Sequence, residues 1–444
     1  MIRRTRFIAL ALAASLAALP TAHAQAGVAA TDSANAAREA WGRGMAALRT
    51  GDTLTARGEI ERAAAAWPTQ PTYVWGRALL AALQGDTVAV LEALDQYARL
   101  GLGRDLRADA RLSAYAALPG SWKTVAAHDR NRAPLPRSRL RARLTDSTFW
   151  PEGMDYDPRS GNYYVGSVRH RTIAEVAPGR PAHELWPRGQ PGYGSVLGVR
   201  VDPKSNVLWA TMSGLNQMEG RIPGDSSIAA LVRVRIADGV IEKRWDLPAI
   251  PGGHVLGDLA VGPRGDVWVT DSNEPVLYRL RVGADTLERV THPLFRSLQG
   301  VTPTPDGRAL YIADYSHGLL RLDIGSGEII KLDDAESSTS VGLDGIAWDR
   351  GAIVGVQNGV APPRIVRFTL DKAGRRSIRS DVIDRNWKVA DEPTIGAVVG
   401  SDFVYVANSQ WEKYDEQGMR KPNTRLIAPM LLAVPLPPTI PAKK

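Results

Sequence analysis

A short strand-and-turn motif recurs six times in the second part of the chain and constrains the fold more than any other feature. Typical copies are "GMDYDP", "GVRVDP" and "DLAVGP", and a second strand-like run such as "DVWVTDS" or "ALYIADY" follows. Successive copies lie 45, 60, 42, 45 and 51 positions apart and begin at Gly153, Gly198, Asp258, Gly300, Gly345 and Gly396. Repeats of roughly 40 to 50 residues with a few strands each are typical of propeller blades. The spacing therefore predicts a mainly β fold, a six-bladed β-propeller over residues 148–438.

The two ends of this region predict how the ring closes. The segment "RLRARLTD" precedes the first copy, "LIAPMLLAVPL" follows the sixth, and both have the pattern of strands. A closed ring leaves no unpaired sheet edge, so we expect these two segments to pair in one blade. Residues 439–444 are then a tail. The longest spacing contains "SGLNQMEGRIPGDSS", which predicts a loop insertion between the second and third copies.

The N-terminal part has a different repeat, with helical periodicity. The segments "WGRGMAALRTGD" and "WGRALLAALQGD" place Trp41 and Trp75, and also Gly51 and Gly85, 34 positions apart. That period is typical of tetratricopeptide-type helical hairpins, so residues 33–128 are expected to form four to six helices. Because such arrays present a concave face to other chains, the module predicts a protein partner.

The remaining segments concern location and boundaries. The N-terminus "MIRRTRFIALALAASLAALPTAHA" has arginines, a short apolar run and small residues, which predicts an export signal over residues 1–24 and a periplasmic or extracellular protein. Between the two repeat regions, "DRNRAPLPRSRLRAR" contains six arginines and two prolines. We interpret residues 129–147 as a solvated linker, with a basic patch for an anionic surface as the alternative.

The bulk composition excludes several classes of protein. The net charge of +8 would fall to +5 on removal of the three arginines in residues 1–24. A chain of this size with so small a net positive charge requires no nucleic-acid partner. The chain has no cysteine, which excludes disulfides, thiol catalysis and thiolate metal sites. No later segment is apolar enough to predict a transmembrane helix. The GxSxG, HExxH and GxxxxGK[ST] motifs are absent, so serine-hydrolase, zincin and P-loop chemistry have no support.

Candidate functional residues follow from the geometry of a propeller. The loops that enter the inner strands converge at one mouth of the central channel, so residues far apart in sequence meet there. The six positions directly before the inner strands are Glu152, Leu197, Gly257, Gln299, Asp344 and Ile395. Three of them carry side-chain oxygens. Two carboxylates and an amide would form a set of hard donors suited to a divalent cation, and Asp344 could then act as a general base.

Four segments also resemble a known family. The "PEG" before the first inner strand, "GDLAVGPRGDVWV", "LQGVTPTPDGRALYIAD" and "LDGIAWDRGAI" are similar to blades of the gluconolactonase and regucalcin (senescence marker protein) superfamily. The resemblance covers the propeller and not the helical module. It implies a six-bladed propeller that binds one divalent cation, commonly calcium or zinc, at the channel mouth and in many members hydrolyses lactones. It matches the ligand positions to Glu152, Gln299 and Asp344.

Two positions depart from the family pattern. Gln299 stands where the family has Asn, and Gly257 stands where the family has a further Asn, although the next residue, Asp258, is retained. The donor set favours calcium, with magnesium, manganese or zinc as alternatives. A bound cation could polarise a lactone or ester carbonyl and lower the pKa of an attacking water.

Further polar residues near strand ends are candidates for contacting a small polar ligand. They come from "PGGHVLGD", "VQNG", "DEPTIG" and "ANSQW", and the candidates are His254, Asp258, Asn358, Glu392, Asn408 and Gln410. Two interpretations remain open. One is an exported, cation-dependent hydrolase of a small lactone or ester; the other is a non-catalytic scaffold in which helices and propeller bind partners and the acids only cap turns.

Overall fold

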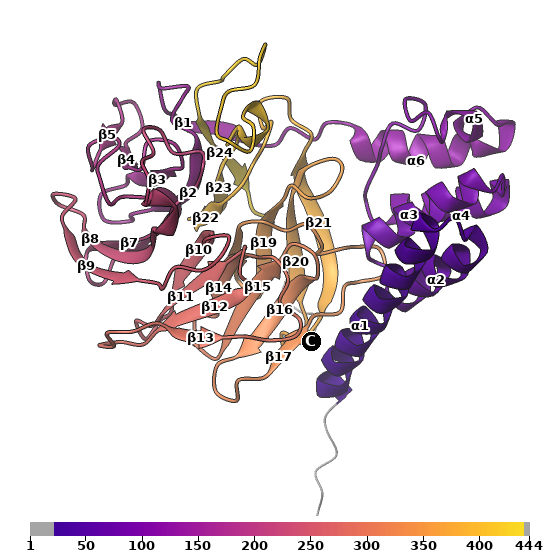
Figure 1. The fold of residues 1–444 in the computed structure, drawn as a ribbon, viewed down its shortest axis with the longest axis horizontal. Helices are drawn as coiled ribbons and strands as arrows, with labels where there is room; N and C mark the ends of the chain where they lie inside the picture. The colour runs from indigo at the N-terminus through magenta and orange to yellow at the C-terminus, as the bar shows by residue number, and fades with distance from the viewer. Residues whose placement is uncertain (1–21, 439–444) are drawn as a thin grey trace, which may run out of the picture.

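The computed structural model describes residues 22–438 as a six-bladed β-propeller with a helical region beside it (Figure 1). This confirms the predicted fold class. The predicted export signal lies almost wholly outside the described residues, and the expected tail, 439–444, lies outside them altogether. Within the described part, no helix is long and apolar enough to cross a membrane.

The helical region consists of two long antiparallel hairpins followed by shorter helices. The elements are α1 (Ala22–Arg49), α2 (Thr53–Ala66), α3 (Pro71–Leu83), α4 (Thr87–Arg99), α5 (Ser113–Ala116), the 3-10 turn η1 (Pro119–Ser121) and α6 (Trp122–Arg132). Helix α6 thus extends four residues beyond the expected module of 33–128 into the segment interpreted as a linker.

The 34-residue repeat has a local structural cause. Gly51 and Gly85 both adopt positive φ, +79° and +71°, at the turns that end α1 and α3. The next residues, Asp52 and Asp86, cap α2 and α4 by accepting backbone N–H bonds of 3.0 and 3.1 Å. Glycine tolerates the left-handed conformation and aspartate is a favoured N-cap, so each "GD" pair specifies a hairpin turn.

The propeller contains six four-stranded sheets. The first three blades are β2 (Pro151–Tyr156), β3 (Tyr163–Ser167), β4 (Ile173–Val176) and β5 (His183–Glu184); β6 (Ser195–Asp202), β7 (Val207–Ser213), β8 (Ala229–Arg235) and β9 (Ile241–Asp246); and β10 (Leu256–Val261), β11 (Val267–Asp271), β12 (Val276–Leu280) and β13 (Glu288–Val290). The next two are β14 (Leu298–Pro303), β15 (Ala309–Asp314), β16 (Gly318–Asp323) and β17 (Ile329–Lys331); and β18 (Ile346–Asp349), β19 (Ala352–Gln357), β20 (Arg364–Leu370) and β21 (Ser377–Arg385). Apolar residues of neighbouring blades share one core, as Trp209 of β7 and Val269 of β11 do.

The sixth blade confirms the predicted ring closure. Its strands are β22 (Gly396–Val399), β23 (Asp402–Val406), β24 (Met430–Pro435) and, as the outermost strand, β1 (Arg139–Arg143) from before the first blade. Strand β1 pairs antiparallel with β24, so the start and end of the propeller share a sheet. The predicted insertion is also present, as the long loop from 214 to 228 between β7 and β8.

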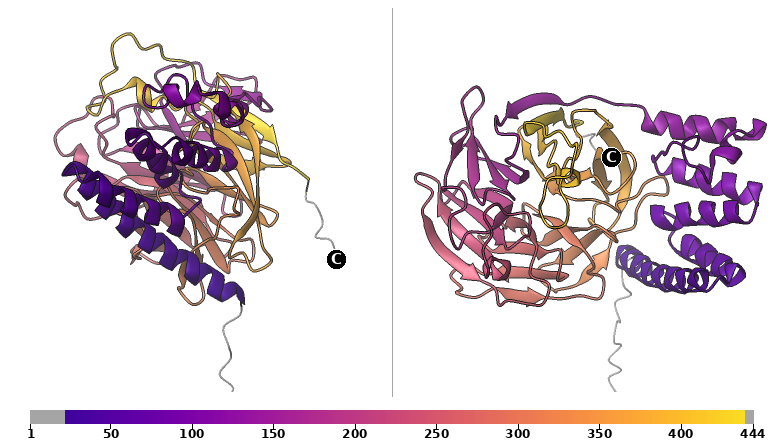
Figure 2. Two further views of the ribbon diagram at one scale, coloured as in Figure 1. Left: turned by 90° about the vertical axis from the view of Figure 1, so that its right-hand side faces the viewer. Right: turned by 45° about the horizontal axis from the view of Figure 1, so that its top comes forward.

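The helices pack beside the propeller against the fourth and fifth blades (Figure 2). The rings of Trp67 and His317 are in contact at a tilt, with centroids 5.8 Å apart, and the Lys331 Nζ lies over the Trp67 ring, 4.7 Å from its centroid. The buried Arg364 of β20 donates hydrogen bonds to the carbonyls of Leu100 and Gly101, at 3.3 and 2.9 Å. Burial lowers the pKa of Arg364 to about 10. The helical region is therefore anchored to loops of the propeller rather than attached only by its linker.

Candidate functional site

A repeated irregularity of the inner strands directs side chains towards the channel mouth. The register between first and second strands shifts at Pro151/Met154, Val196/Val199, Leu256/Asp258 and Leu298/Val301. Glu152, Leu197, Gly257 and Gln299 lie within these four shifts. Bulges re-aim the side chain at the point where pairing is interrupted. The same shift in strand register therefore places one residue of each of these four blades at the channel mouth.

A glycine follows three of these four positions, all but Gly257, and permits close approach of neighbouring blades. A Cβ on Gly153 would lie 1.9 Å from the carbonyl oxygen of Leu197, and one on Gly300 would lie 2.5 Å from that of Asp344. The backbone N–H of Gly300 also donates to the Asp344 carbonyl at 3.0 Å. Side chains larger than hydrogen would force the inner strands apart. The recurring glycine of the motif is thus a packing requirement.

The six predicted mouth positions line one cavity of about 190 Å³. Asp258 and three side chains that the motif does not indicate, Val255, Ser272 and Trp411, complete the cavity wall. The full lining is Glu152, Leu197, Val255, Gly257, Asp258, Ser272, Gln299, Asp344, Ile395 and Trp411. Trp411 belongs to the long segment 407–429 between β23 and β24, which lies over this end of the propeller (Figure 2).

Glu152 is a buried acid with a single side-chain partner. It is 8% exposed, and its Oε2 accepts a hydrogen bond of 2.7 Å from the indole Nε1–H of Trp411. Burial, reinforced by the nearby Asp344 carboxyl, raises the pKa of Glu152 well above its usual range. Among the described residues, no Lys or Arg forms an ion pair with it. Its negative charge is therefore uncompensated by the protein.

Asp344 is buried to the same extent and is positioned by Asn358. The Nδ2 of Asn358 donates to Asp344 Oδ2 at 2.7 Å and to the Pro393 carbonyl at 2.9 Å, while its Oδ1 accepts from the Tyr315 hydroxyl at 3.1 Å. Burial raises the pKa of Asp344 to about 7, although the Asn358 bond opposes this shift. Asn358 thus fixes the orientation of the acid rather than lining the cavity itself.

Gln299 and Asp258 have different roles at the cavity wall. The Nε2 of Gln299 donates to Ser297 Oγ at 3.2 Å, and its Oε1 lies 3.8 Å from where a Cβ on Gly257 would stand. The longer side chain therefore reaches into the space that Gly257 leaves open. Asp258 instead forms an ion pair of 3.0 Å with Arg200, and burial raises its pKa to about 6.

Three further candidates, Asn408, Gln410 and Glu392, do not line the cavity, and the first two have their polar groups occupied by other hydrogen bonds. Asn408 Oδ1 accepts the Met430 N–H at 2.9 Å, and Gln410 bonds the Ser147 carbonyl at 3.1 Å and the Ile427 N–H at 2.7 Å. These bonds anchor the segment 407–429. Glu392 lies close enough to raise the pKa of Glu152, and burial raises its own pKa to about 7.

His254 lies in a separate cluster with Asp271 and Glu274, the one group of three metal-ligand side chains found within 4.8 Å in the described chain. Its Nδ1 bonds Asp271 at 2.5 Å, and its Nε2 bonds the Pro248 carbonyl at 2.9 Å. Both partners are acceptors, so both ring nitrogens donate and the ring is an imidazolium. Burial would lower the pKa of His254, but these bonds outweigh burial and raise it.

The donor set of the cavity fits a hard divalent cation better than the His254 cluster does. Glu152, Asp344 and Gln299 supply oxygens without a competing cation, and calcium takes roughly six to eight oxygen ligands, part of them water. A volume of about 190 Å³ holds about six water-sized volumes, enough for an ion and its remaining waters. In the other cluster, His254 carries its own positive charge and Glu274 is paired with Arg289 at 2.5 Å.

The sequence motif did not identify the parts of the site that come from irregular loops. The motif does not indicate Trp411, Tyr315, Ser272 or Arg200 as parts of the site. Trp411 donates a hydrogen bond directly to Glu152, and Tyr315 donates to Asn358, which in turn bonds Asp344; in each bond the partners are distant in sequence. A polar run before a tryptophan, as in "ANSQW", was the one available signal.

Comparisons with known proteins find only distant structural similarity and assign no activity to this chain. No family model matches the chain, and no curated protein matches it. Among solved structures, the chain is similar to virginiamycin B lyase from Staphylococcus aureus, with 18% identity over 60% of this chain and 80% of that one and a TM-score of 0.44. It is also similar to a streptogramin B lyase (16% identity, 67% and 98% coverage, TM-score 0.44) and to a luciferin-regenerating enzyme (13%, 68% and 95%, 0.45). At these identities and TM-scores, no activity of those proteins is transferred to this chain.

Proposed function

We propose that the channel-mouth cavity binds one divalent cation, calcium in the first instance, and that the loaded site hydrolyses a small lactone or ester. The single observation that carries the proposal is the pair of buried carboxyls, Glu152 and Asp344, that share one cavity without a cationic partner among the described residues. Burying uncompensated carboxylates is costly, so such a pair is stabilised either by protons or by a bound cation.

Each side chain has a defined task in this proposal. Glu152, Asp344 and Gln299 would hold the cation, which when bound supplies Lewis acidity towards a carbonyl and lowers the pKa of a neighbouring water. Asn358 keeps Asp344 Oδ2 fixed, so that Asp344 accepts a proton from the attacking water in a constant geometry. Trp411 covers the cavity and holds Glu152, which limits access of bulk water.

A panel of small lactones and esters tests the hydrolase proposal. Chelator-treated protein is expected to be inactive and to regain hydrolysis on addition of calcium or another divalent cation. Glu152→Gln and Asp344→Asn, which preserve volume and remove charge, should each lower the rate by roughly 100-fold or more. Glu274→Gln is the matched control, because it removes an acid from the other cluster, and it should keep the rate. Cation binding without any hydrolysis across the panel would favour the scaffold alternative.

We also propose export and a protein partner for the helical region. The hairpin tips carry exposed apolar side chains, Leu54 at 81%, Leu83 at 71% and Val88 at 68% exposed. The tips are tied together by the Arg57–Asp86 ion pair of 2.6 Å, so these residues belong to one surface. Cross-linking of the full chain in its cells of origin, against a Leu54→Glu/Val88→Glu variant, tests the partner. Identical cross-links for both proteins would argue against this surface.

Fractionation of the same cells tests export.

A further inference from the structure

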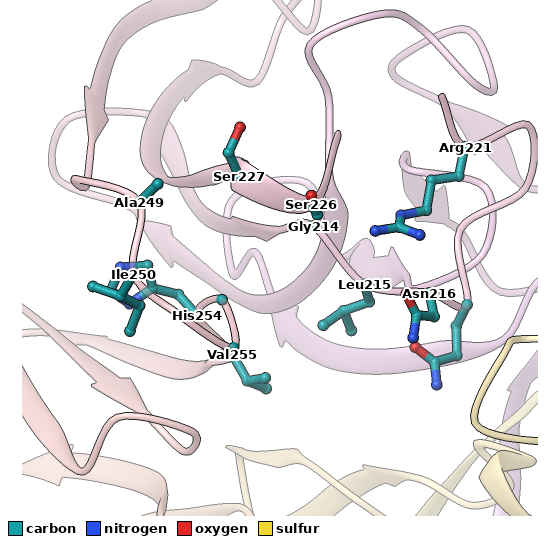
Figure 3. A pocket seen from close by; sticks show the side chains of 13 residues that line it. Gly214, Leu215, Asn216, Arg221, Ser226, Ser227, Ala249, Ile250, His254 and Val255 are labelled. Atoms are coloured by element: carbon teal, nitrogen blue, oxygen red, sulfur yellow. The ribbon is translucent and has the colours of Figure 1, made fainter. Parts of the chain in front are cut away.

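A second and larger pocket lies beside the cation-site cavity. It has a volume of about 490 Å³ and is formed by the 214–228 loop between β7 and β8 and the 249–255 loop before β10 (Figure 3). Val255 lines both this pocket and the cavity. The cavity is only large enough for an ion, its waters and the reacting end of a substrate. The rest of a substrate must therefore occupy neighbouring space, and this pocket adjoins it.

Arg221 contributes a positive charge to this pocket that the protein does not neutralise. It comes from the loop insertion, and among the described residues it forms no ion pair and no side-chain hydrogen bond. The two acids nearest to it in the loop are already bound. Asp225 pairs with Arg171 at 3.1 Å, and Glu219 bonds His170 at 2.8 Å. The partner of the Arg221 guanidinium must therefore come from outside the chain or be solvent.

The loop that carries Arg221 is held in place by buried contacts. The guanidinium of Arg171, itself 2% exposed as a residue, donates to the carbonyls of Glu219 and Gly220 at 2.8 and 3.1 Å. On the other side, Asn216 donates to the Glu416 carbonyl at 3.1 Å. A binding group on a fixed backbone loses less conformational entropy when a ligand binds. Arg221 is therefore positioned on a preorganised loop.

The remaining walls indicate what kind of anion fits. Figure 3 shows the Arg221 guanidinium and Asn216 on one side of the pocket and Ile250, His254 and Val255 on the other. The lining also contains apolar side chains and small polar groups; these are Leu215, Ala249, Gln217, Ser226 and Ser227. The imidazolium of His254 is already neutralised by Asp271, so one net positive charge remains. One planar guanidinium matches one carboxylate in bidentate geometry.

We propose that the Arg221 pocket binds the carboxylate of a small monoanionic ligand with a partly apolar body. Where the proposed function holds, it follows that the lactone or ester substrate carries a free carboxylate, bound by Arg221 while its reacting carbonyl lies in the cavity. A dianion such as a phosphate ester fits less well, because the single guanidinium of Arg221 neutralises only one negative charge.

Benzoate and benzamide are suitable probes, since they share shape and differ in charge. Titration calorimetry or NMR titration of the full chain in chelator should show benzoate binding roughly tenfold more tightly than benzamide. Arg221→Gln should remove that preference, and Arg221→Lys should retain part of it. Arg180→Gln is the control, because it removes the same charge from an exposed loop between β4 and β5 and should change nothing.

The outcomes separate this proposal from the cation site. Benzoate preference that persists in Glu152→Gln and is lost in Arg221→Gln supports the pocket even if no cation binds. Equal affinity for benzoate and benzamide in the wild type overturns the proposal, whatever the result for the cation. Equal loss of affinity in Arg180→Gln and Arg221→Gln also overturns it, since the effect would then reflect net charge alone. Inorganic phosphate binding more tightly than benzoate would contradict the assignment of a monoanion.

Discussion

Two clusters of acidic side chains lie on the same face of the propeller, and their charges are compensated in different ways. In the first, Glu152 and Asp344 share a cavity with amide and indole partners but no cation. In the second, Asp271 receives the His254 imidazolium, and Glu274 is paired with Arg289. The closer packing of ligand atoms is found in the second cluster, yet only the first has unneutralised charge. Charge compensation, rather than proximity of acids, therefore distinguishes a candidate ligand site from a structural network.

The largest expected effect is on stability and comes from the compensated cluster. Asp271 accepts hydrogen bonds from His254 and from the backbone N–H groups of Val255 and Asn273. In Asp271→Asn one acceptor oxygen is lost, so either the imidazolium or the backbone groups are left unpaired. We expect the free energy of unfolding to fall by about 3 kcal/mol, measured by urea denaturation. Asp285→Asn, at an acid with an 85% exposed side chain, is the control and should change it little. An equally small change for Asp271→Asn would show that this cluster is not structural.

The next effect is the dependence of stability on pH in metal-free protein. The folded-state pKa values of Asp344 and Glu392, about 7, and of Asp258, about 6, lie above those of the unfolded chain. The folded state then holds more protons than the unfolded state, so stability is fully present below about pH 4 and falls as pH rises through 6 to 7. In chelator, we expect a loss on the order of 2 kcal/mol that Asp344→Asn reduces. Identical pH profiles for the two proteins would contradict the raised pKa of Asp344.

A smaller effect is expected from removing the charge of Glu152. Because this carboxyl is buried and uncompensated, Glu152→Gln should raise the free energy of unfolding in chelator at pH 8 by about 1 kcal/mol. Saturating calcium should reverse the order, since only the wild type would gain stability from the ion. Thermal denaturation with and without calcium measures both. A destabilised variant in chelator would place Glu152 with the structural acids.

The smallest expected effect concerns the indole that holds Glu152. Trp411→Phe retains an aromatic ring beside Trp150, whose ring centroid is 5.0 Å from that of Trp411, and removes the N–H donor to Glu152. We expect a change in the free energy of unfolding of about 0.5 to 1 kcal/mol and a further rise in the pKa of Glu152. NMR titration of the glutamate side chains measures the pKa. An unchanged pKa would mean that the hydrogen bond is not formed in solution.

The sequence predicted the mouth of the propeller well because one local pattern encodes it. In four of the six copies a glycine that the neighbouring blade approaches closely follows the mouth residue, and the regular spacing located Glu152, Gln299 and Asp344. The pairing of β1 with β24 was predictable for a different reason, because only a closed ring leaves no unpaired sheet edge.

The interactions around the mouth could not be predicted in this way. They are made by loops that do not repeat, such as the segment that carries Trp411. Nothing in the "PGGHVLGD" pattern indicates that Asp271 and the Pro248 carbonyl occupy both nitrogens of His254. The free charge of Arg221 is equally invisible in sequence, because it depends on Arg171 and His170 binding the acids nearby.

Calcium titration into chelator-treated protein, followed by calorimetry, compares the two acidic clusters most directly. We predict one calcium per chain for the wild type and for Glu274→Gln, and no binding for folded Glu152→Gln or Asp344→Asn. Calcium that is retained in both of those variants and lost in Glu274→Gln would contradict this assignment and move the cation to the His254 cluster.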